Sequence, residues 1–355
     1  MKKIIYNTDH PAPFIDRIVE ELEKYMAVEC WYFIKHTNNK NWKTYSPKDL
    51  HLYSDVNIIR RCIHFSKYDL VILRWGTINN VITGLLLFLF GTPFCFYLDH
   101  PDPSFSKIGV VPRLFKTLLF KAATAILPAS YSCCDYLHNV YKLPYERMHV
   151  FPYSHSLPSN DIDVINGERS TKLIEGDKVR VLIASRFIER KGYSTVYDTL
   201  LLLKNEHLLD RLSISIVGNG ELFNSYKTKF LELDQSIKIL GWVENEEYER
   251  LLDTTDIYLH PSYFEPFGIP PLDAMERNKM VLVTDGVKST DIFANNEGIL
   301  IYPKYDSVNL AKLMIELINN SGKIYDKTKN NCDLVQKYYS LRVNVNSIND
   351  IIAVL

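Results

Sequence analysis

The stretch "DIYLHPSYFEPFGIPPLDAM", residues 256–275, passes from a β-rich run into a helix through a turn that contains glycine and proline. Pro270 and Pro271 suit the first helical turn, where a missing N–H group costs nothing. Gly268, just before them, lets the backbone approach a ligand closely. The start of this helix therefore offers free N–H groups and a positive dipole end, which together predict an anion site.

Two acidic residues belong to the same stretch, Glu265 in the turn and Asp273 eight positions later. Acidic groups near a helix N-terminus are favoured by the helix dipole, so helix capping is one interpretation of both residues. The other interpretation is that Glu265 lies where the hydroxyl groups of a ligand would meet it. The stretch alone is compatible with both, and the rest of the chain has to decide between them.

The composition is that of a soluble globular protein. The chain has 355 residues, of which 46% are apolar and 23% charged, and a chain of this length is expected to form two domains. A formal net charge of −1 gives no argument for nucleic-acid binding. The six cysteines show no CxxC spacing, which favours reduced thiols over a disulfide framework or a zinc site.

The longest apolar run is "VITGLLLFLFGTPFCFYL" (81–98), which is interrupted by Gly91, Thr92 and Pro93. This interruption favours a buried helix followed by a buried strand over a membrane span. The N-terminal apolar run "IIYN" is also too short for a signal peptide. We therefore expect a cytoplasmic protein, either free or bound peripherally to the inner face of the cell membrane.

Short β-rich runs alternate with helical stretches along the whole chain, which is typical of an α/β fold with parallel sheets and crossover helices. The strands expected in the first half are 3–7, 70–75, 93–99, 124–130 and 148–153. Those expected in the second half are 179–185, 212–218, 236–241, 256–262, 280–285 and 298–303.

This pattern predicts two Rossmann-like, doubly wound domains that face each other across a cleft, at 1–158 and 179–339. Residues 159–178 are polar and without apolar periodicity, so they are the expected linker. The final segment, 340–355, is apolar at helical spacing and either closes the second domain or packs back on the first. The expected ligand site faces the carboxyl ends of the strands.

Basic and glycine-containing segments follow the expected strands of the second half. Arg186 and Lys191 flank a turn in "SRFIERKG", "GNGEL" (218–222) is a tight turn that opens a helix, and Gly241 leaves backbone amides free. A lone cation near a strand end is usually solvated, but cations at several strand ends on one side of a sheet favour a binding site. Two cations and an amide-lined helix start suit a diphosphate better than a single carboxylate.

Five segments of the second half resemble, in order, the motifs of retaining GT-B glycosyltransferases of the glycosyltransferase family 4 kind. They are "SRFIERKG", "VGNGEL", "LGWV", "DIYLHPSYFEPFGIPPLDAM" and "VLVTD". The first half is similar more weakly, in "YDLVILRWG", "PFCFYLDH", "ILPASYSCCDYL" and "VFPYSHSLP". The resemblance implies an α/β GT-B enzyme of surface polysaccharide synthesis. Such an enzyme moves a sugar, with retention, from a nucleotide-diphosphate donor to a glycan or lipid-linked glycan acceptor.

The resemblance also implies a role for each matching residue. Arg186 and Lys191 bind the diphosphate, and Glu265 meets the hydroxyl groups of the transferred sugar. Asp273 binds the ribose hydroxyls, although it is one methylene shorter than the glutamate usual in the family. The remaining donor-binding positions act largely through the backbone and are Gly220, Gly241, Trp242, Val243, Phe267, Gly268 and Ile269.

In the first half, the resemblance places a histidine near the transferred sugar at a strand end, and His100 matches it. Asp99 is its neighbour, but alternate residues of a strand point to opposite faces, so only one of the two should line the cleft. Asp9 and His10, in the loop "NTDHPAP" (7–13), are further candidates for acceptor contact.

Neither a cofactor nor a metal ion is expected, because cationic side chains take the place that a metal has in other transferases. The sequence "DID" (161–163) matches the Asp-x-Asp pattern of metal-dependent transferases. It lies in the expected linker with no strand before it, so we interpret it as a chance match.

Residues 107–121 suggest a membrane contact, because no acidic residue lies between Asp102 and Asp135. On a helix from about Pro112, three cations share a face with Phe120, beside a face that is apolar. The residues concerned are Lys107, then Arg113, Lys116 and Lys121 on the basic face, and Leu114, Phe115 and Leu118 on the apolar face. A basic face with an embedded aromatic ring can lie on an anionic membrane, and a solvated amphipathic helix is the alternative.

Two other functions fit the same residues. One is a nucleotide-sugar epimerase or a glycoside phosphorylase on the same fold, and the other is a non-catalytic protein that binds sugar nucleotides. A hydride-transfer enzyme is excluded, because "GNGELF" has no third glycine and no acidic residue follows where it would read a ribose.

Overall fold

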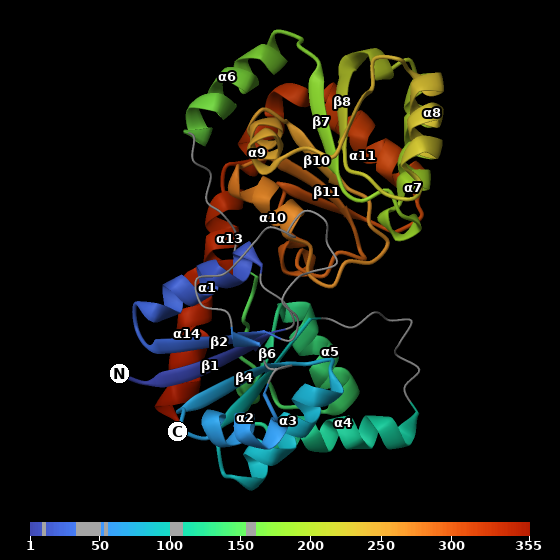
Figure 1. Cartoon of the computed structure of the whole chain (residues 1–355). Coiled ribbons are helices and arrows are strands. Elements are labelled where there is room, and N and C mark those ends of the chain that lie inside the picture. The colour runs from blue at the N-terminus through green and yellow to red at the C-terminus, as the bar shows by residue number, and fades with distance from the viewer. Residues whose placement is uncertain (9–11, 33–50, 53–55, 100–108, 154–160) are drawn as a thin grey trace. The chain divides into compact units, whose positions relative to one another are not determined.

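Two parallel β-sheets organise the chain, one in each of two units (Figure 1). Unit 1 comprises Met1–His155 together with Tyr338–Leu355, and unit 2 comprises Ser156–Lys337. The computed structural model describes residues 1–8, 12–32, 51–52, 56–99, 109–153 and 161–355.

The sheet of unit 1 has the strand order β3-β2-β1-β4-β5-β6 over the described residues, and all of these pairs are parallel. Its strands are β1 (Lys3–Thr8), β2 (Ala27–Tyr32), β3 (His51–Leu52), β4 (Leu70–Arg74), β5 (Phe94–Leu98) and β6 (Ala125–Pro128). Its helices are α1 (Pro13–Glu23), α2 (Ile58–Phe65), α3 (Ile78–Leu89), α4 (Val110–Ala122), α5 (Tyr131–Tyr141) and α14 (Leu341–Ala353). Helices on both faces bury β5 along its whole length, which explains its uninterrupted apolar sequence.

The prediction of a strand at 148–153 is wrong. The segment runs beside β6 and donates hydrogen bonds from His149 and Phe151, but the only bridge that its described residues form joins Met148 to Ile126. Pro128 and Pro152 have no N–H group to donate, so a reciprocal ladder cannot continue. The strand β2, which was not predicted, has four half-buried residues among its six and therefore lacks a clear apolar pattern.

The apolar run 81–98 forms a helix and a strand, as predicted, but the helix is not fully buried. Gly84 and Leu87 of α3 face β5, and a Cβ atom on Gly84 would lie 2.9 Å from the ring of Phe96. The opposite side of α3, which includes Leu85 and Leu89, is exposed. Over the ranges that the structure describes, no helix has both the length and the apolar character needed to cross a membrane.

The predicted basic face of α4 is also wrong in one respect. Phe120 is buried and packs against Trp75 and Phe96, so it is part of the core and not of a surface. The aromatic residue that α4 exposes is Phe115. Lys107 lies outside the described residues.

The C-terminal helix α14 packs against α1 in unit 1 (Figure 1). Two buried polar side chains of α14 bond to the backbone after β6. The amide of Asn344 donates to the carbonyl of Pro152 at 2.9 Å, and the hydroxyl of Ser347 donates to that of Val150 at 2.6 Å. These bonds place the end of the chain on the first unit.

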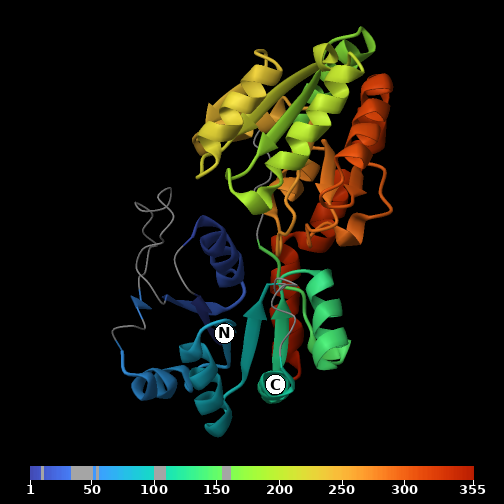
Figure 2. The same ribbon diagram turned by 90° about the vertical axis from the view of Figure 1, so that its right-hand side faces the viewer.

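The sheet of unit 2 has the order β12-β11-β10-β7-β8-β9 in the described range 161–337, again with parallel pairs. Its strands are β7 (Val179–Ala184), β8 (Leu212–Val217), β9 (Lys238–Gly241), β10 (Ile257–His260), β11 (Met280–Thr284) and β12 (Ile299–Tyr302). Its helices are α6 (Ile162–Ile174), α7 (Tyr193–Asn205), α8 (Phe223–Leu233), α9 (Asn245–Asp253), α10 (Ile269–Glu276), α11 (Ser307–Asn319), α12 (Ile324–Thr328) and α13 (Asn331–Tyr339), which continues into unit 1. Figure 2 shows the strands of this sheet with helices on its two faces.

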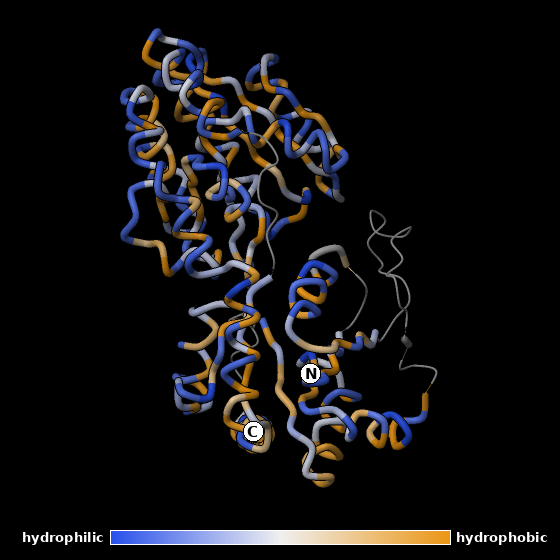
Figure 3. Tube along the Cα trace, turned by 90° about the vertical axis from the view of Figure 1, so that its left-hand side faces the viewer, coloured by the Kyte–Doolittle hydropathy of each residue, from blue (hydrophilic) through white to orange (hydrophobic). Residues whose placement is uncertain are grey.

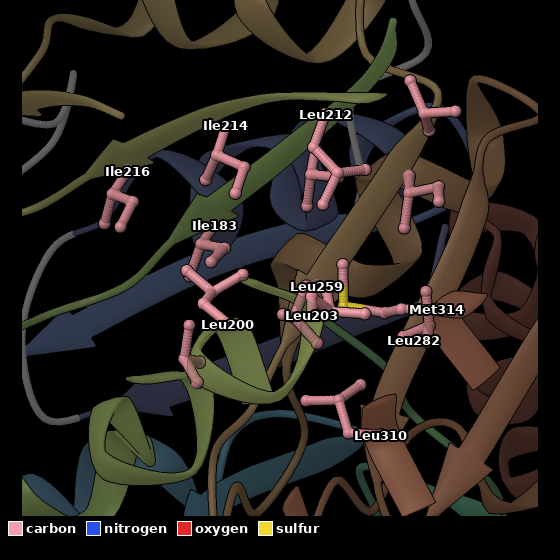
Figure 4. Close-up of a cluster of buried hydrophobic side chains, with 14 of the residues drawn as sticks. Ile183, Leu200, Leu203, Leu212, Ile214, Ile216, Leu259, Leu282, Leu310 and Met314 are labelled. Atoms are coloured by element: carbon pink, nitrogen blue, oxygen red, sulfur yellow. The ribbon is translucent and has the colours of Figure 1, made fainter. Parts of the chain in front are cut away.

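Aliphatic side chains fill the space between this sheet and its helices. In Figure 4, Leu203 of α7 and Met314 of α11 lie near Leu259 and Leu282 of the two central strands, and all four are buried. In Figure 3, hydrophobic residues are frequent along the strands, while the helices alternate between hydrophilic and hydrophobic positions. This alternation is the pattern expected of helices that cover a sheet.

The predicted linker 159–178 contains a helix, α6. Asp161 of the "DID" sequence caps it by accepting a hydrogen bond from the N–H of Val164. The helix is held mainly by buried polar contacts, because Arg169 pairs with Asp256 at 2.7 Å and Asn166 accepts from Lys279 at 2.5 Å. Such contacts leave no apolar periodicity, which is why the sequence did not predict this helix.

Lys279 lies at the centre of this polar network and is fully buried. Its ammonium donates to Asn166 and to the carbonyl oxygen of Asp253. Burial lowers the pKa of Lys279 to about 7, against the opposing charges of Asp256 and Asp253. Between about pH 7 and 10, the unfolded state therefore holds a proton on this group that the folded state lacks, and stability increases with pH.

We predict that Lys279→Met flattens this dependence. In urea unfolding at pH 7 and pH 9, the wild-type free energy of unfolding should rise by about 1–3 kcal/mol more than that of the variant, since one pKa unit corresponds to about 1.4 kcal/mol. Lys312→Met, at an exposed position of α11, is the matched control and should follow the wild type. Equal pH slopes for all three proteins would contradict the shifted lysine.

Candidate active site

The strand order of unit 2 creates a topological switch point between β7 and β10. The chain proceeds from β7 to β8 and β9 on one side, and later adds β10, β11 and β12 on the other. The two crossovers leave the sheet in opposite directions at this point, so ligands of doubly wound folds bind just beyond the carboxyl ends of these two strands.

Backbone hydrogen bonds join the loops that follow β7, β10 and β11. The N–H of Tyr263 donates to the carbonyl of Arg190 at 2.8 Å, and the guanidinium of Arg190 donates to the carbonyl of Phe264 at 3.0 Å. The N–H of Glu265 donates to the carbonyl of Gly286 at 2.9 Å. The turn that carries Glu265 is thus fixed on both sides.

The loops after β8 and β9 join the same edge. The N–H of Phe187 donates to the carbonyl of Asn219 at 3.0 Å, and that of Gly218 donates to the carbonyl of Gly241 at 2.7 Å. The predicted positions Gly220 and Gly241 therefore lie in loops connected to that of Arg186. Trp242, next to Gly241, is 51% exposed, as a base-stacking residue would be without its ligand.

An ion pair occupies the switch point. The ammonium of Lys191, which is 9% exposed, contacts the carboxylate of Glu265, which is 19% exposed. The guanidinium of Arg190 lies 3.9 Å from the same carboxylate, and Nε2 of His260 lies 3.8 Å from it. The structure therefore brings the predicted residues Lys191 and Glu265 into direct contact.

The protonation states follow from these surroundings. Burial alone raises the pKa of Glu265, but the hydrogen bond from His260 and the charge of Lys191 outweigh it, so the pKa lies far below its usual range. Burial lowers the pKa of Lys191, and the charge of Glu265 partly offsets this effect. Burial also lowers the pKa of His260, which is therefore neutral near pH 7.

Arg186 adds a further positive charge. Its side chain is exposed, and within the described chain it forms no ion pair. Its charge, with that of Arg190, contributes to lowering the pKa of Lys191, so the three cations act on the same region. One carboxylate, that of Glu265, faces them.

The start of α10 lies against the same turn. Gly268 has φ +90°, and a Cβ atom there would lie 3.2 Å from Cγ of Glu265 and 2.9 Å from Val287. No side chain caps this helix, and Pro270 and Pro271 have no N–H group, so Gly268 and Ile269 carry the backbone donors that remain at this end. Glu265 is held by Lys191 instead, which excludes the capping interpretation for it.

Asp273 lies in the second turn of α10 and so does not cap the helix either, because the helix begins at Ile269. Its side chain is half-buried near Tyr248 of α9, where its charge adds to burial in raising the pKa of that tyrosine. The structure places Asp273 on the same helix as the donor amides but away from the Lys191–Glu265 pair.

In unit 1, Asp99 follows β5 and is held by two neighbours. The hydroxyl of Tyr153 donates to its carboxylate oxygens at 2.8 and 2.9 Å, and the guanidinium of Arg74 pairs with it at 3.2 Å. The other predicted residues of this half, Asp9, His10 and His100, lie outside the described residues.

Two residues of the site were not predicted. Arg190 stands beside Lys191 in "ERKG", and the run of two cations was the available signal. His260 is the last residue of β10, and Nδ1 of its buried ring has no hydrogen-bond partner in the described chain. A histidine that ends an apolar strand directly before the Glu265 turn could have indicated it. In the described ranges no group of three His, Cys, Asp or Glu residues is placed to hold a metal ion.

Comparisons with known proteins agree with this site. Residues 165–333 match the family model of glycosyl transferases group 1, so the resemblance drawn from the motifs is confirmed. An uncharacterized glycosyltransferase of Methanocaldococcus jannaschii is 23% identical over 57% of this chain and 55% of its own length. The amylovoran biosynthesis glycosyltransferase AmsK of Erwinia amylovora is 25% identical over 41% of this chain and 37% of its own. The chain thus spans about half the length of these relatives, or less.

Solved structures show the fold. Anabaena HepE in complex with UDP superposes with a TM-score of 0.74 at 16% identity, over the whole of both chains. The lipopolysaccharide outer core galactosyltransferase WaaB has a TM-score of 0.69 at 15% identity, over 99% of this chain and 100% of its own. The predicted fold class, two Rossmann-like α/β domains of the GT-B type, is therefore confirmed.

We predict that Gly192→Ala destabilises unit 2. Gly192 has φ +71°, and a Cβ atom would lie 2.0 Å from the carbonyl oxygen of Pro261, which forces apart the loops after β7 and β10. A loss of roughly 2–4 kcal/mol is expected in urea unfolding, from the left-handed backbone and the overlap together.

Gly167→Ala is the control for this prediction, because Gly167 lies in α6 with no heavy atom within 4 Å of the added Cβ. It should leave the stability unchanged or raise it by up to about 1 kcal/mol through helix propensity. A Gly192→Ala protein as stable as the Gly167→Ala protein would show that the two loops do not approach as described.

Proposed function

We propose that this protein transfers a sugar from a nucleotide-diphosphate donor to a glycan or lipid-linked glycan acceptor. The observation that carries this proposal is the charge balance at the switch point of unit 2. Arg186, Arg190 and Lys191 face the single carboxylate of Glu265, and His260 is neutral, so the site has an excess of two positive charges. A nucleotide sugar carries two negative charges on its diphosphate, which would balance this excess.

Each residue has a role in the proposed reaction. Arg186 and Lys191 bind the diphosphate, and the N–H groups at the start of α10 add oriented dipoles to the same phosphates. Glu265 stays ionised beside Lys191 and accepts hydrogen bonds from hydroxyl groups of the sugar. Asp273 receives the ribose and residues 241–243 the base.

The chemistry follows from where charge develops. When the bond between the sugar and the diphosphate breaks, negative charge grows on the leaving phosphate oxygens, and the cations stabilise this charge more than that of the ground state. We propose that the acceptor hydroxyl attacks from the same face, with a phosphate oxygen taking its proton, so that configuration is retained and no protein nucleophile is needed. The cations supply the charge that a divalent metal ion would otherwise supply.

Surface polysaccharide synthesis is the proposed setting, and the name of AmsK, an amylovoran biosynthesis glycosyltransferase, supports it. The proposed location is the cytoplasmic face of the cell membrane, where residues 107–121 contact anionic lipid. The UDP complex of HepE favours a uridine nucleotide as the first donor to test.

A thermal-shift screen with chelator present tests donor binding. At least one uridine or guanosine diphosphosugar should raise the melting temperature, because a ligand that binds only the folded state stabilises it by mass action. The shift should be absent in Lys191→Met, which removes the buried ammonium. A panel in which no nucleotide sugar stabilises the wild type would contradict the proposal.

Arg186→Ala should reduce turnover by about 10²–10³-fold, which is the typical effect of removing one group that stabilises transition-state charge. The assay follows release of nucleoside diphosphate from the donor identified by the thermal screen. Because Arg186 is exposed, the fold should be unaffected.

Arg250→Ala is the matched control, since Arg250 pairs only with Glu247 on α9 in the described structure and should leave turnover unchanged. Unchanged turnover in Arg186→Ala would reject its role. Conversion of labelled donor to an epimer without transfer would identify the protein as an epimerase.

A further inference from the structure

The outer face of α3 is apolar and open to solvent. Ile78, Ile82, Leu85 and Leu89 follow one another at spacings of four, three and four residues, so they share one side of the helix. They are 71%, 40%, 37% and 74% exposed. The opposite side of α3 covers the sheet, so this stripe is additional to the residues that the core of unit 1 requires.

A second apolar stripe runs along α4. Val111, Leu114, Phe115 and Leu118 recur at helical spacing and are each at least 52% exposed. The helix is already anchored by Phe120 on its other side. Helices α3 and α4 pack against each other (Figure 1), so the two stripes are neighbours on the surface of unit 1. Exposed patches of this extent usually mark an interaction site.

The charges around this α3–α4 face have one sign. Neither α3 nor α4 contains an aspartate or glutamate, and α2, which packs beside α3, contains none either. Arg113 and Lys121 are exposed on α4, with Lys116 half-buried between them. The whole chain has 42 acidic and 41 basic residues, so this region departs from the average.

The charge pattern selects the partner. In a symmetric dimer through this face, the cations of one copy would approach those of the other, which opposes association. An anionic lipid surface instead accepts apolar side chains at the acyl boundary and cations at the phosphate level.

We infer that the α3–α4 face is a docking surface for anionic lipid membranes, with both stripes inserted and Arg113, Lys116 and Lys121 at the headgroups. This inference extends the membrane contact proposed for 107–121 to α3, which has no charged residue and contributes only apolar area. It concerns unit 1 and does not depend on the transfer reaction, so its test requires no activity.

Co-sedimentation of the full chain with vesicles tests it. The protein should bind vesicles of phosphatidylcholine mixed with phosphatidylglycerol and remain in solution with phosphatidylcholine alone. Replacing Arg113 and Lys121 together by glutamine should weaken the partition constant about 30-fold, at roughly fivefold for each cation. In the α3 variant, Ile82, Leu85 and Leu89 are replaced by glutamine, and about tenfold or more should be lost.

The controls separate docking from general loss of apolar surface. Val308 on α11 of unit 2 is 54% exposed, so Val308→Gln should bind like the wild type. All variants should keep the wild-type melting temperature and its shift by nucleotide sugar, if one is found.

The inference is overturned if the wild type does not bind anionic vesicles, or if the α3 variant binds as strongly as Val308→Gln. It is also overturned in favour of self-association if light scattering shows a concentration-dependent dimer that the α3 variant abolishes. Because no readout uses catalysis, failure of the proposed transfer reaction would leave this result unaffected.

Discussion

A buried ammonium group is stable in a folded protein only when an anion and hydrogen-bond acceptors accompany it, and Lys191 meets this requirement through Glu265. The two residues come from loops that follow different strands, so the pair forms only if the loops after β7 and β10 approach closely. The site of unit 2 thus depends on this one contact between segments 74 residues apart. Arg190 reinforces it, because its backbone and side chain both bond to the loop that carries Glu265.

Glycine makes this approach possible. Gly192 and Gly286 bring backbone within distances that no Cβ atom would permit, since one would lie 2.0 Å from the carbonyl oxygen of Pro261 and the other 2.1 Å from that of Tyr263. Gly268 has the same function at the start of α10, where it leaves the amides uncovered. The motif therefore combines two needs, a positive φ or a missing side chain for the turns and cations for the ligand.

The sequence predicted the parts of this arrangement that are local. Strand ends, the proline pair before α10 and the cations after β7 are visible in short windows, so Arg186, Lys191 and Glu265 could be assigned to one edge of one sheet. Features that depend on long-range contacts were missed. The helix α6 is held by ion pairs to Asp256 and Lys279, and the exposure of α3 depends on which side faces β5, so neither follows from periodicity alone. The segment 148–153 has a strand-like sequence but lacks the N–H donors for a ladder.

The two clusters of charge in unit 2 explain why the ligand site lies at one edge of the sheet and not at the other. Near the amino ends of the strands, Arg169, Arg277 and Lys279 are matched by Asp177, Asp253 and Asp256. Equal numbers of cations and anions, all engaged with one another, fix α6 and the strands in place and leave no charge for a partner. Near the carboxyl ends, three cations share one carboxylate, and the helix α10 presents its positive end to the same region. An uncompensated cluster of this kind is costly in the unliganded protein, because like charges lower the pKa of the buried lysine. That cost is removed when a dianionic ligand binds, so the imbalance itself favours the diphosphate.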